Sequence, residues 1–211
     1  MNRGKPIIGV TGGIGAGKST VAQILQELGA AVIDSDRLGH EALANENIVA
    51  SLRAWWGDDI VDVSGGIDRK ALASVVFEDP ESLARLEGLV YPWIHAQRRL
   101  IVARLNEDAN IRVIVFDAPK LYEAGVDREC DAVIFVECDR ALRVSRVRRD
   151  RGWDETELSR RESRQIPLDV KREKADYIVS NHSSVEALRP ELERIMLSVL
   201  TRSKRPAAPA P

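Results

Sequence analysis

The sequence predicts an α/β fold: a doubly wound, parallel, five-stranded sheet with two helical outgrowths. Five short runs of β-branched and other apolar residues read as strands, and amphipathic helical patterns separate them. Each run is apolar at odd and even positions, as expected where helices cover both faces of a parallel sheet. The 211-residue chain is 44% hydrophobic, enough for one such core. The expected strands are residues 6–11, 30–36, 112–118, 132–137 and 176–180.

The helical patterns between these strands differ in length and in how they begin and end. Residues 18–28 carry apolar side chains at helical spacing, and Gly29 ends the pattern. Residues 81–107 form a long amphipathic pattern, which we expect Pro92 to kink or split. Capping-box spacing predicts two further helix starts, at Asp154 with Glu157 and at Ser183 with Glu186.

The spacing of the strands predicts the domain organisation. About 75 residues separate the second and third strands and read as helices only, far more than one crossover helix needs. We therefore expect a core of residues 1–36, 110–139 and 175–203, with a helical insert at 37–109. A second helical excursion occupies residues 140–174, and the Pro/Ala-rich residues 204–211 read as a disordered tail.

Charge and cysteine content limit the function classes. The net charge of −2 does not suggest a nucleic-acid-binding protein, but residues 140–174 hold 12 Lys/Arg and 7 Asp/Glu, a net of +5. That segment either binds a local anion or forms a salt-bridged helix pair. Cys130 and Cys138 read as reduced thiols, which favours a cytoplasmic protein. No apolar run approaches the ~18 residues of a membrane span, so we expect no membrane partner. We expect a monomer or weak homo-oligomer, although no feature of the sequence gives the oligomeric state.

A glycine-rich loop follows the first strand. Gly12 to Ser19 matches G-x-x-x-x-G-K-[ST], the phosphate-binding loop, between an apolar strand and an amphipathic helix. Glycines allow backbone N–H groups to converge on one anion, and the helix N-terminus favours negative charge. Lys18 then bridges the β- and γ-phosphates, and Ser19 can ligate Mg²⁺. The expected ATP-binding residues here are Gly13, Ile14, Gly15, Ala16, Gly17, Lys18, Ser19 and Thr20.

Acidic residues end the second and third strands, where ligands bind in such sheets. Alternation places Asp34 and Asp36 on one face, so that one can accept a proton from a hydroxyl and the other can orient Mg²⁺-bound water. The other interpretation is that Asp36 caps the following helix. Asp117 is placed like a Walker-B carboxylate, which reaches Mg²⁺ directly or through water.

These features favour a small kinase with a P-loop NTPase-like fold. The chain lacks the N-K-x-D motif that reads guanine, and a nucleotide-dependent switch protein needs no acceptor base beside an arginine-rich lid. The acceptor itself stays open at this point. A nucleoside or nucleoside monophosphate kinase has the same loop and sheet.

The motifs together resemble the dephospho-coenzyme A kinase family over about residues 6–200. The resemblance is carried by "TGGIGAGKST", "VIDSD", "GGIDRKALASVVF", "FDAPKLYEAG", "RALRVSRVRRDRGWDETELSRRESRQ" and "ADYIVSN". It implies ATP-dependent phosphorylation of the ribose 3′-hydroxyl of dephospho-coenzyme A. It also implies that Asp36 is the base, that Arg146 clamps the transferred phosphate from the lid, and that Asn181 contacts adenine. The helical insert would hold the coenzyme A arm.

Three departures from the family pattern lie on the acceptor side and in the lid. Tyr91 precedes Pro92 where the family usually has His, Lys120 stands where it has Leu, and Asp150 stands where it has a second lid arginine. The quoted motifs and these departures give the expected acceptor-binding residues, which are Asp36, Arg69, Tyr91, Lys120 and Glu123. Asp36, Lys18 and Arg146 are the expected catalytic residues.

Overall fold

The computed structural model describes residues 4–182 and 185–203. The capping box expected at Ser183 and the tail expected at 204–211 lie outside the described residues. The chain divides into two compact units, one of Met1–Ile33 with Arg104–Pro211 and one of Asp34–Ala103. We describe each unit by itself.

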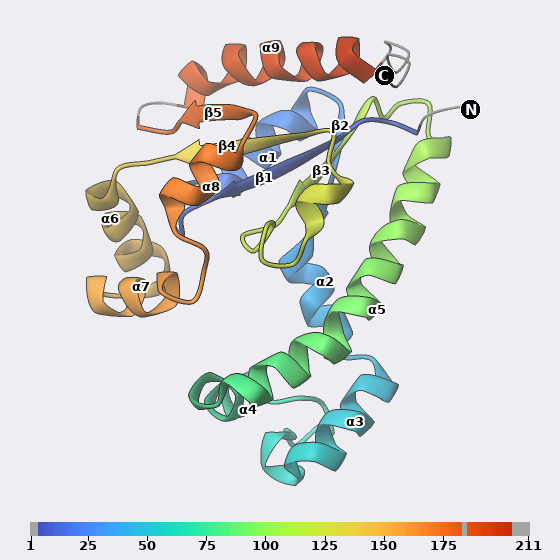
Figure 1. Ribbon diagram of the computed structural model, residues 1–211, viewed down its shortest axis with the longest axis vertical. Helices are drawn as coiled ribbons and strands as arrows, with labels where there is room; N and C mark the ends of the chain where they lie inside the picture. Colours follow the sequence, from blue (N-terminus) through green and yellow to red (C-terminus); the bar gives the residue numbers. More distant parts are fainter. Residues whose placement is uncertain (1–3, 183–184, 204–211) are drawn as a thin grey trace, which may run out of the picture. The chain divides into compact units, whose positions relative to one another are not determined.

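The first unit is built on a five-stranded sheet, shown in Figure 1, with the strand order β2-β3-β1-β4-β5. β1 pairs in parallel with β3 and β4, and β4 pairs in parallel with β5. The predicted parallel α/β fold is therefore confirmed. The strands are β1 (Ile7–Gly12), β2 (Ala30–Asp34), β3 (Val113–Asp117), β4 (Ala132–Glu137) and β5 (Tyr177–Ser180).

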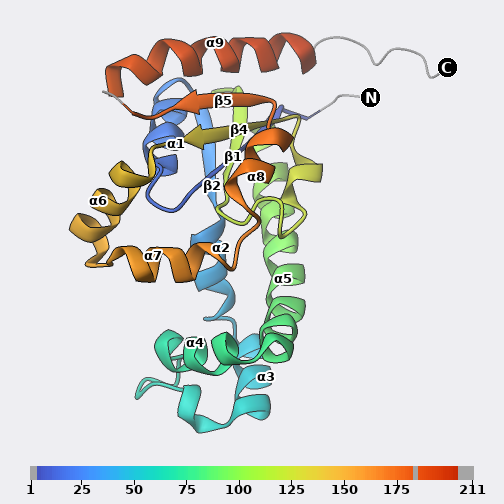
Figure 2. The same cartoon turned by 60° about the vertical axis from the view of Figure 1, so that its left-hand side comes forward.

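Helices cover both faces of this sheet. α1 (Lys18–Glu27) contacts α9 (Val185–Ser203), and both pack on the face to which Ile8 and Val10 point. The next residue of β1, Gly9, faces Leu121 on the opposite side, and α8 (Leu168–Lys174) contacts β1 and β4. In Figure 1, α8 lies in front of β1 and α1 lies behind it, and Figure 2 shows α9 running along β5. Burial on both faces explains why apolar residues occur at odd and even positions of the strands.

A helical hairpin fills the gap between β4 and α8. α6 (Arg140–Arg151) ends at Gly152, whose φ of 68° is left-handed. α7 (Glu155–Glu162) begins where Asp154 accepts a hydrogen bond from the Glu157 N–H at 2.8 Å, as the capping-box spacing predicted. A short 3₁₀ helix, η2 (Val126–Glu129), lies between β3 and β4. Cys130 and Cys138 are free thiols of intermediate burial.

The second unit is helical and has a hydrophobic core of its own. It also contains an isolated β-bridge between Val61 and Ile67. Pro92 does not split the long helix, because α5 continues through it, whereas the expected kink at Pro92 stays a prediction; Figure 1 shows α5 changing direction along its course. Val90 lies in the core of this unit, and Trp93 and Ile94, beside Pro92, are partly buried against it. The helices are α2 (Ser35–Ala42), α3 (Glu46–Trp56), η1 (Asp58–Ile60), α4 (Arg69–Glu78) and α5 (Pro80–Glu107). Among the described residues, no helix is long and apolar enough to span a membrane.

Candidate active site

The glycine-rich loop joins β1 to α1 in the conformation of an anion cradle. Gly15 and Gly17 have φ angles of 77° and 91°, in the left-handed region that glycine adopts without strain. No side chain caps the start of α1, so its first N–H groups have no side-chain acceptor and are available to an anion at the helix end. The Lys18 ammonium donates to the carbonyls of Gly12 at 3.1 Å and Gly13 at 3.0 Å, and so it lies over the loop. These groups together can hold the phosphates of a nucleotide.

Asn181, directly after β5, supports this loop from beneath. Its amide Nδ2 donates to the Ala16 carbonyl at 2.7 Å, and the residue is only 5% exposed. A Cβ atom on Gly17 would lie 2.1 Å from that Nδ2, so the position has no room for a larger residue. The resemblance gave Asn181 a contact with adenine, which stays a prediction. The brace under the loop was missed, because it joins two distant parts of the sequence.

Arg146, on α6, contacts the other side of the same loop. One guanidinium nitrogen donates to the Ala16 carbonyl at 3.2 Å, and the other donates to the Asn181 carbonyl at 3.3 Å. The Cys138 sulfur lies 3.3 Å from the first nitrogen. Burial raises the pKa of the Cys138 thiol, although the positive charges of Arg146 and Arg143 oppose the shift. The structure therefore brings the predicted lid arginine together with the predicted phosphate loop.

Arg143, one turn earlier on α6, was missed by the sequence analysis. It is 5% exposed, donates to the carbonyls of Cys138 at 3.3 Å and Ile14 at 3.4 Å, and forms an ion pair with Glu162 of α7. A Cβ atom on Gly13 would lie 2.9 Å from its guanidinium. Its position three residues before Arg146, on the same helix face, was the available signal.

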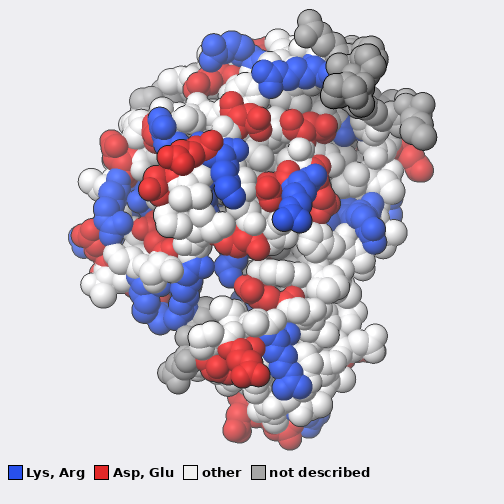
Figure 3. Space-filling model, in the orientation of Figure 1, with Lys and Arg blue, Asp and Glu red and all other residues white. Residues whose placement is uncertain are grey.

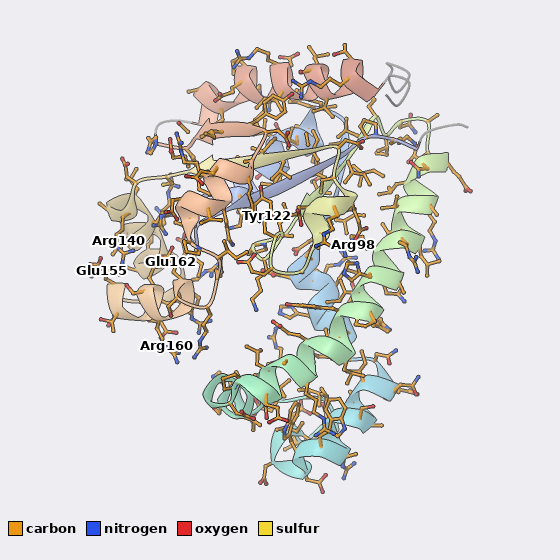
Figure 4. All side chains as sticks on the ribbon, in the orientation of Figure 1. Arg98, Tyr122, Arg140, Glu155, Arg160 and Glu162 are labelled. Carbon is orange, nitrogen blue, oxygen red and sulfur yellow. The ribbon has the colours of Figure 1, made fainter. Side chains whose placement is uncertain are left out.

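The basic segment neutralises much of its own charge. Arg140 pairs with Glu155 at 2.9 Å and with Glu162 at 3.2 Å, and Figure 4 shows these side chains between α6 and α7. Arg160 and Arg161 both donate to Glu157, at 2.8 Å and 2.6 Å, and these bonds lower the pKa of Glu157 to about 2. In Figure 3, acidic and basic side chains alternate over this hairpin. The salt-bridged helix pair, one of the two readings of this segment, is present.

Asp117 ends β3 beside the phosphate loop. In the sheet it lies opposite Val10, two residues before the end of β1, and it is half-buried. Ser19 lies exposed in the first turn of α1. A carboxylate and a hydroxyl are hard oxygen donors, the kind that Mg²⁺ takes together with phosphate oxygens and water. Among the described residues, no group of three or more His, Cys, Asp or Glu is arranged to hold a metal ion.

The turn after β3 carries Lys120 and Glu123, two of the expected acceptor residues. Glu123 Oε1 accepts from the Lys171 ammonium at 2.7 Å and from the Ile166 N–H at 2.9 Å. Its other oxygen is buried and has no hydrogen-bond partner among the described residues. Tyr122, labelled in Figure 4, lies between Lys120 and Glu123 in the sequence. Burial is the main cause that raises the pKa of Tyr122 to about 12, and the phenol is neutral at pH 7. Lys171 was missed by the sequence analysis.

In the second unit, the placement of the two aspartates differs from the sequence prediction. β2 ends at Asp34, and α2 begins at Ser35. Asp34 is the helix cap, because its Oδ1 accepts from the N–H groups of Asp36 at 2.8 Å and Arg37 at 3.0 Å. The alternation argument is therefore wrong: Asp36 lies in the first turn of a helix and not on the strand. The cap bonds rotate the chain out of the extended conformation two residues earlier than expected.

Two further expected acceptor residues lie in the second unit. The Arg69 guanidinium, at the start of α4, lies 2.6 Å from the Nε2 atom of His40 on α2. The Tyr91 hydroxyl donates to Glu87 of the same helix at 2.8 Å. Arg69 thus connects two helices of this unit, whereas Tyr91 is held along α5.

The comparisons with known proteins agree with this loop and sheet. The family model for dephospho-CoA kinase matches residues 6–187. A dephospho-CoA kinase of Corynebacterium glutamicum is 36% identical over 198 residues, which are 92% of this chain and 98% of that protein. A solved structure from Thermus thermophilus has a TM-score of 0.78 and 34% identity, covering 96% of this chain and all of the other. Dephospho-CoA kinase from Campylobacter jejuni has a TM-score of 0.68 and 25% identity, covering 93% and 98%. The chain belongs to the dephospho-CoA kinase family.

Proposed function

We propose that this kinase transfers the γ-phosphoryl group of ATP to the ribose 3′-hydroxyl of dephospho-coenzyme A, with Asp36 as the general base. The class of reaction is inferred from the membership of the chain in the dephospho-CoA kinase family. The observation that carries the donor site is the loop between β1 and α1, with its left-handed glycines and uncapped helix start. The remaining assignments concern what each side chain does.

On the donor side, the loop N–H groups hold the phosphates. Lys18 exchanges its bonds to the Gly12 and Gly13 carbonyls for bonds to phosphate oxygens, where it stabilises the developing charge. Arg146 and Asn181 keep the Ala16 carbonyl fixed, so the cradle is formed before the nucleotide enters. We assign Mg²⁺, which would neutralise phosphate charge, to Ser19 and, directly or through water, to Asp117.

On the acceptor side, Asp36 orients the ribose hydroxyl and takes its proton. Asp34 caps α2 and so fixes the turn that presents Asp36, two residues after the end of β2. A ribose hydroxyl is a weak nucleophile until its proton has an acceptor, and a carboxylate within hydrogen-bond reach supplies one. Arg69, Tyr91 and Lys120 are assigned to the acceptor, with Lys120 binding one of its phosphate groups. Glu123 is also assigned to the acceptor, which it would contact through its Oε2 atom.

A nucleoside or nucleoside monophosphate kinase is not favoured, because the family and the curated relatives are dephospho-CoA kinases. One assay separates these activities. ATP consumption is measured with dephospho-coenzyme A, with nucleosides or nucleoside monophosphates, and without an acceptor. Turnover with dephospho-coenzyme A far above the other arms is the expected result. Turnover that does not depend on an acceptor would instead indicate a hydrolytic switch protein.

A further inference from the structure

We infer that Lys171 is a positioning residue for the acceptor: it holds the turn after β3, which carries Lys120, against the end of the basic segment. The inference rests on the proposed role of Lys120. Lys171 lies on α8 and is fully buried. Its ammonium donates to the Pro119 carbonyl at 2.9 Å, to the Gln165 side-chain carbonyl at 3.0 Å and to Glu123 Oε1 at 2.7 Å.

Three donors meet three acceptors at this position, so the hydrogen-bonding capacity of the ammonium is used in full. An ion pair this deep is costly to desolvate and weak evidence for stability alone, since a well-packed apolar pair often serves as well. The three hydrogen bonds of the Lys171 ammonium, however, form only when the chain segments that carry the acceptors lie in one arrangement. The three acceptors come from the β3 turn and from the link between α7 and α8, segments that no strand pairing joins.

The Ile166 N–H adds a second tie by donating to Glu123 Oε1 at 2.9 Å. The end of the basic segment and the turn are therefore held to each other at two points around one carboxylate oxygen. Pro119, whose carbonyl binds the ammonium, directly precedes Lys120 and follows Asp117 by two residues. Releasing the ammonium frees the backbone from which Lys120 projects. Lys171 cannot itself bind a substrate phosphate, because it is buried and fully engaged.

Two variants separate positioning from charge neutralisation. Lys171→Met leaves Glu123 as an unpaired buried charge and is expected to lower the melting temperature. Lys171→Met combined with Glu123→Gln removes that charge and keeps an acceptor for the Ile166 N–H, so most of the melting temperature should return. Arg172→Met is the matched control, because it removes an exposed cation of the same helix that pairs with Glu137 instead.

If Lys171 positions the turn, the double variant has a KM for dephospho-coenzyme A about tenfold or more above that of Glu123→Gln alone, while its KM for ATP stays within twofold of wild type. The Glu123→Gln single variant is needed because Glu123 is itself assigned to the acceptor. Lys120→Leu should show the same split, and Arg172→Met should show neither change. Wild-type stability together with an acceptor KM equal to that of Glu123→Gln in the double variant would overturn the inference and leave Lys171 as a counter-ion. An equal rise in both KM values would also overturn it.

A substrate-free measurement keeps this test distinct from the proposed function. Hydrogen exchange of residues 118–125 and 163–168 should be faster in the double variant than in wild type and in Glu123→Gln alone, whatever the acceptor is. Unchanged exchange would refute the positioning role even if the kinase assay failed. Faster exchange in a protein that does not phosphorylate dephospho-coenzyme A would overturn the proposed function alone.

Discussion

At the scale of single residues, the first prediction concerns Lys18, which we propose as the cation that binds the nucleotide phosphates. Lys18→Ala removes the cation that lies over the phosphate loop. We expect kcat/KM to fall by an amount equivalent to ~2–4 kcal/mol of transition-state stabilisation, as for other single electrostatic contacts. Steady-state kinetics measure this loss, and circular dichroism should stay native. Full activity in a folded variant would contradict the kinase mechanism itself.

Asp34 and Asp36 give a second prediction, because Asp34 caps α2 and we propose Asp36 as the general base. Asp36→Asn keeps the size of the side chain but removes the proton acceptor, so turnover should fall by roughly 10²–10⁴ while ATP binding survives. Asp34→Asn should leave turnover nearly intact, because Asn caps helices as well as Asp does. Kinetics and ATP titration measure both variants.

A companion substitution controls for the cap itself. Asp34→Ala should cost ~0.5–2 kcal/mol of unfolding free energy, measured by urea denaturation, because the bonds to the N–H groups of Asp36 and Arg37 are lost. If Asp34 proved essential for turnover and Asp36 tolerant, the general base would have to be reassigned.

At the scale of elements, α7 carries the clearest pH dependence. Hydrogen bonds from Arg160 and Arg161 lower the pKa of Glu157 from its ordinary 4.5 to about 2. Because the pKa is depressed in the folded state, its contribution to stability is complete above pH 4.5 and is lost as the pH falls through about 2. An NMR titration of the Glu157 carboxyl measures the pKa directly. It should return to its ordinary range when both arginines are replaced by alanine, and an unchanged low value would show that these arginines are not the cause.

α5 contains a proline in its interior, a position that the local preference of proline disfavours. Pro92 removes one helical hydrogen bond, and its ring opposes a continuous helix. The helix nevertheless continues through it, and Trp93 and Ile94 beside it are partly buried against the core of the second unit. Full burial of one large apolar side chain contributes about 1.5–3 kcal/mol, which is comparable with the local cost of about 3 kcal/mol. The position of the proline was visible in the sequence, but the packing around it was not.

At the scale of the whole molecule, the ligands should protect different segments. An ATP analogue bound to the phosphate loop should slow hydrogen exchange at residues 12–20. If residues 140–174 act as a lid, exchange at about residues 140–170 should slow further when the acceptor binds as well. Equal exchange in that segment with and without ligands would mean that its ion pairs hold a static helix pair. Dephospho-coenzyme A alone should protect residues near Asp36 and Arg69.

The sequence by itself determined the elements whose causes are local. Positive φ at Gly15 and Gly17 favours glycine, and parallel strands covered on both faces favour apolar residues at odd and even positions. Both patterns can be recognised within a few consecutive residues of the sequence. The phosphate loop, the five strands and the family therefore followed from the sequence. The end of β2 did not, because the cap at Asp34 competes with strand alternation within two residues.

The tertiary structure decided which side chains support the site, because their partners are distant in sequence. Asn181 reaches a carbonyl 165 residues away, Arg143 one 129 residues away, and Lys171 one 52 residues away. The residue types at those positions do not show whether the amide, guanidinium or ammonium is buried, because burial depends on the packing of segments that are distant in the sequence. Buried polar groups must find partners, and only the folded chain shows which partners are within reach.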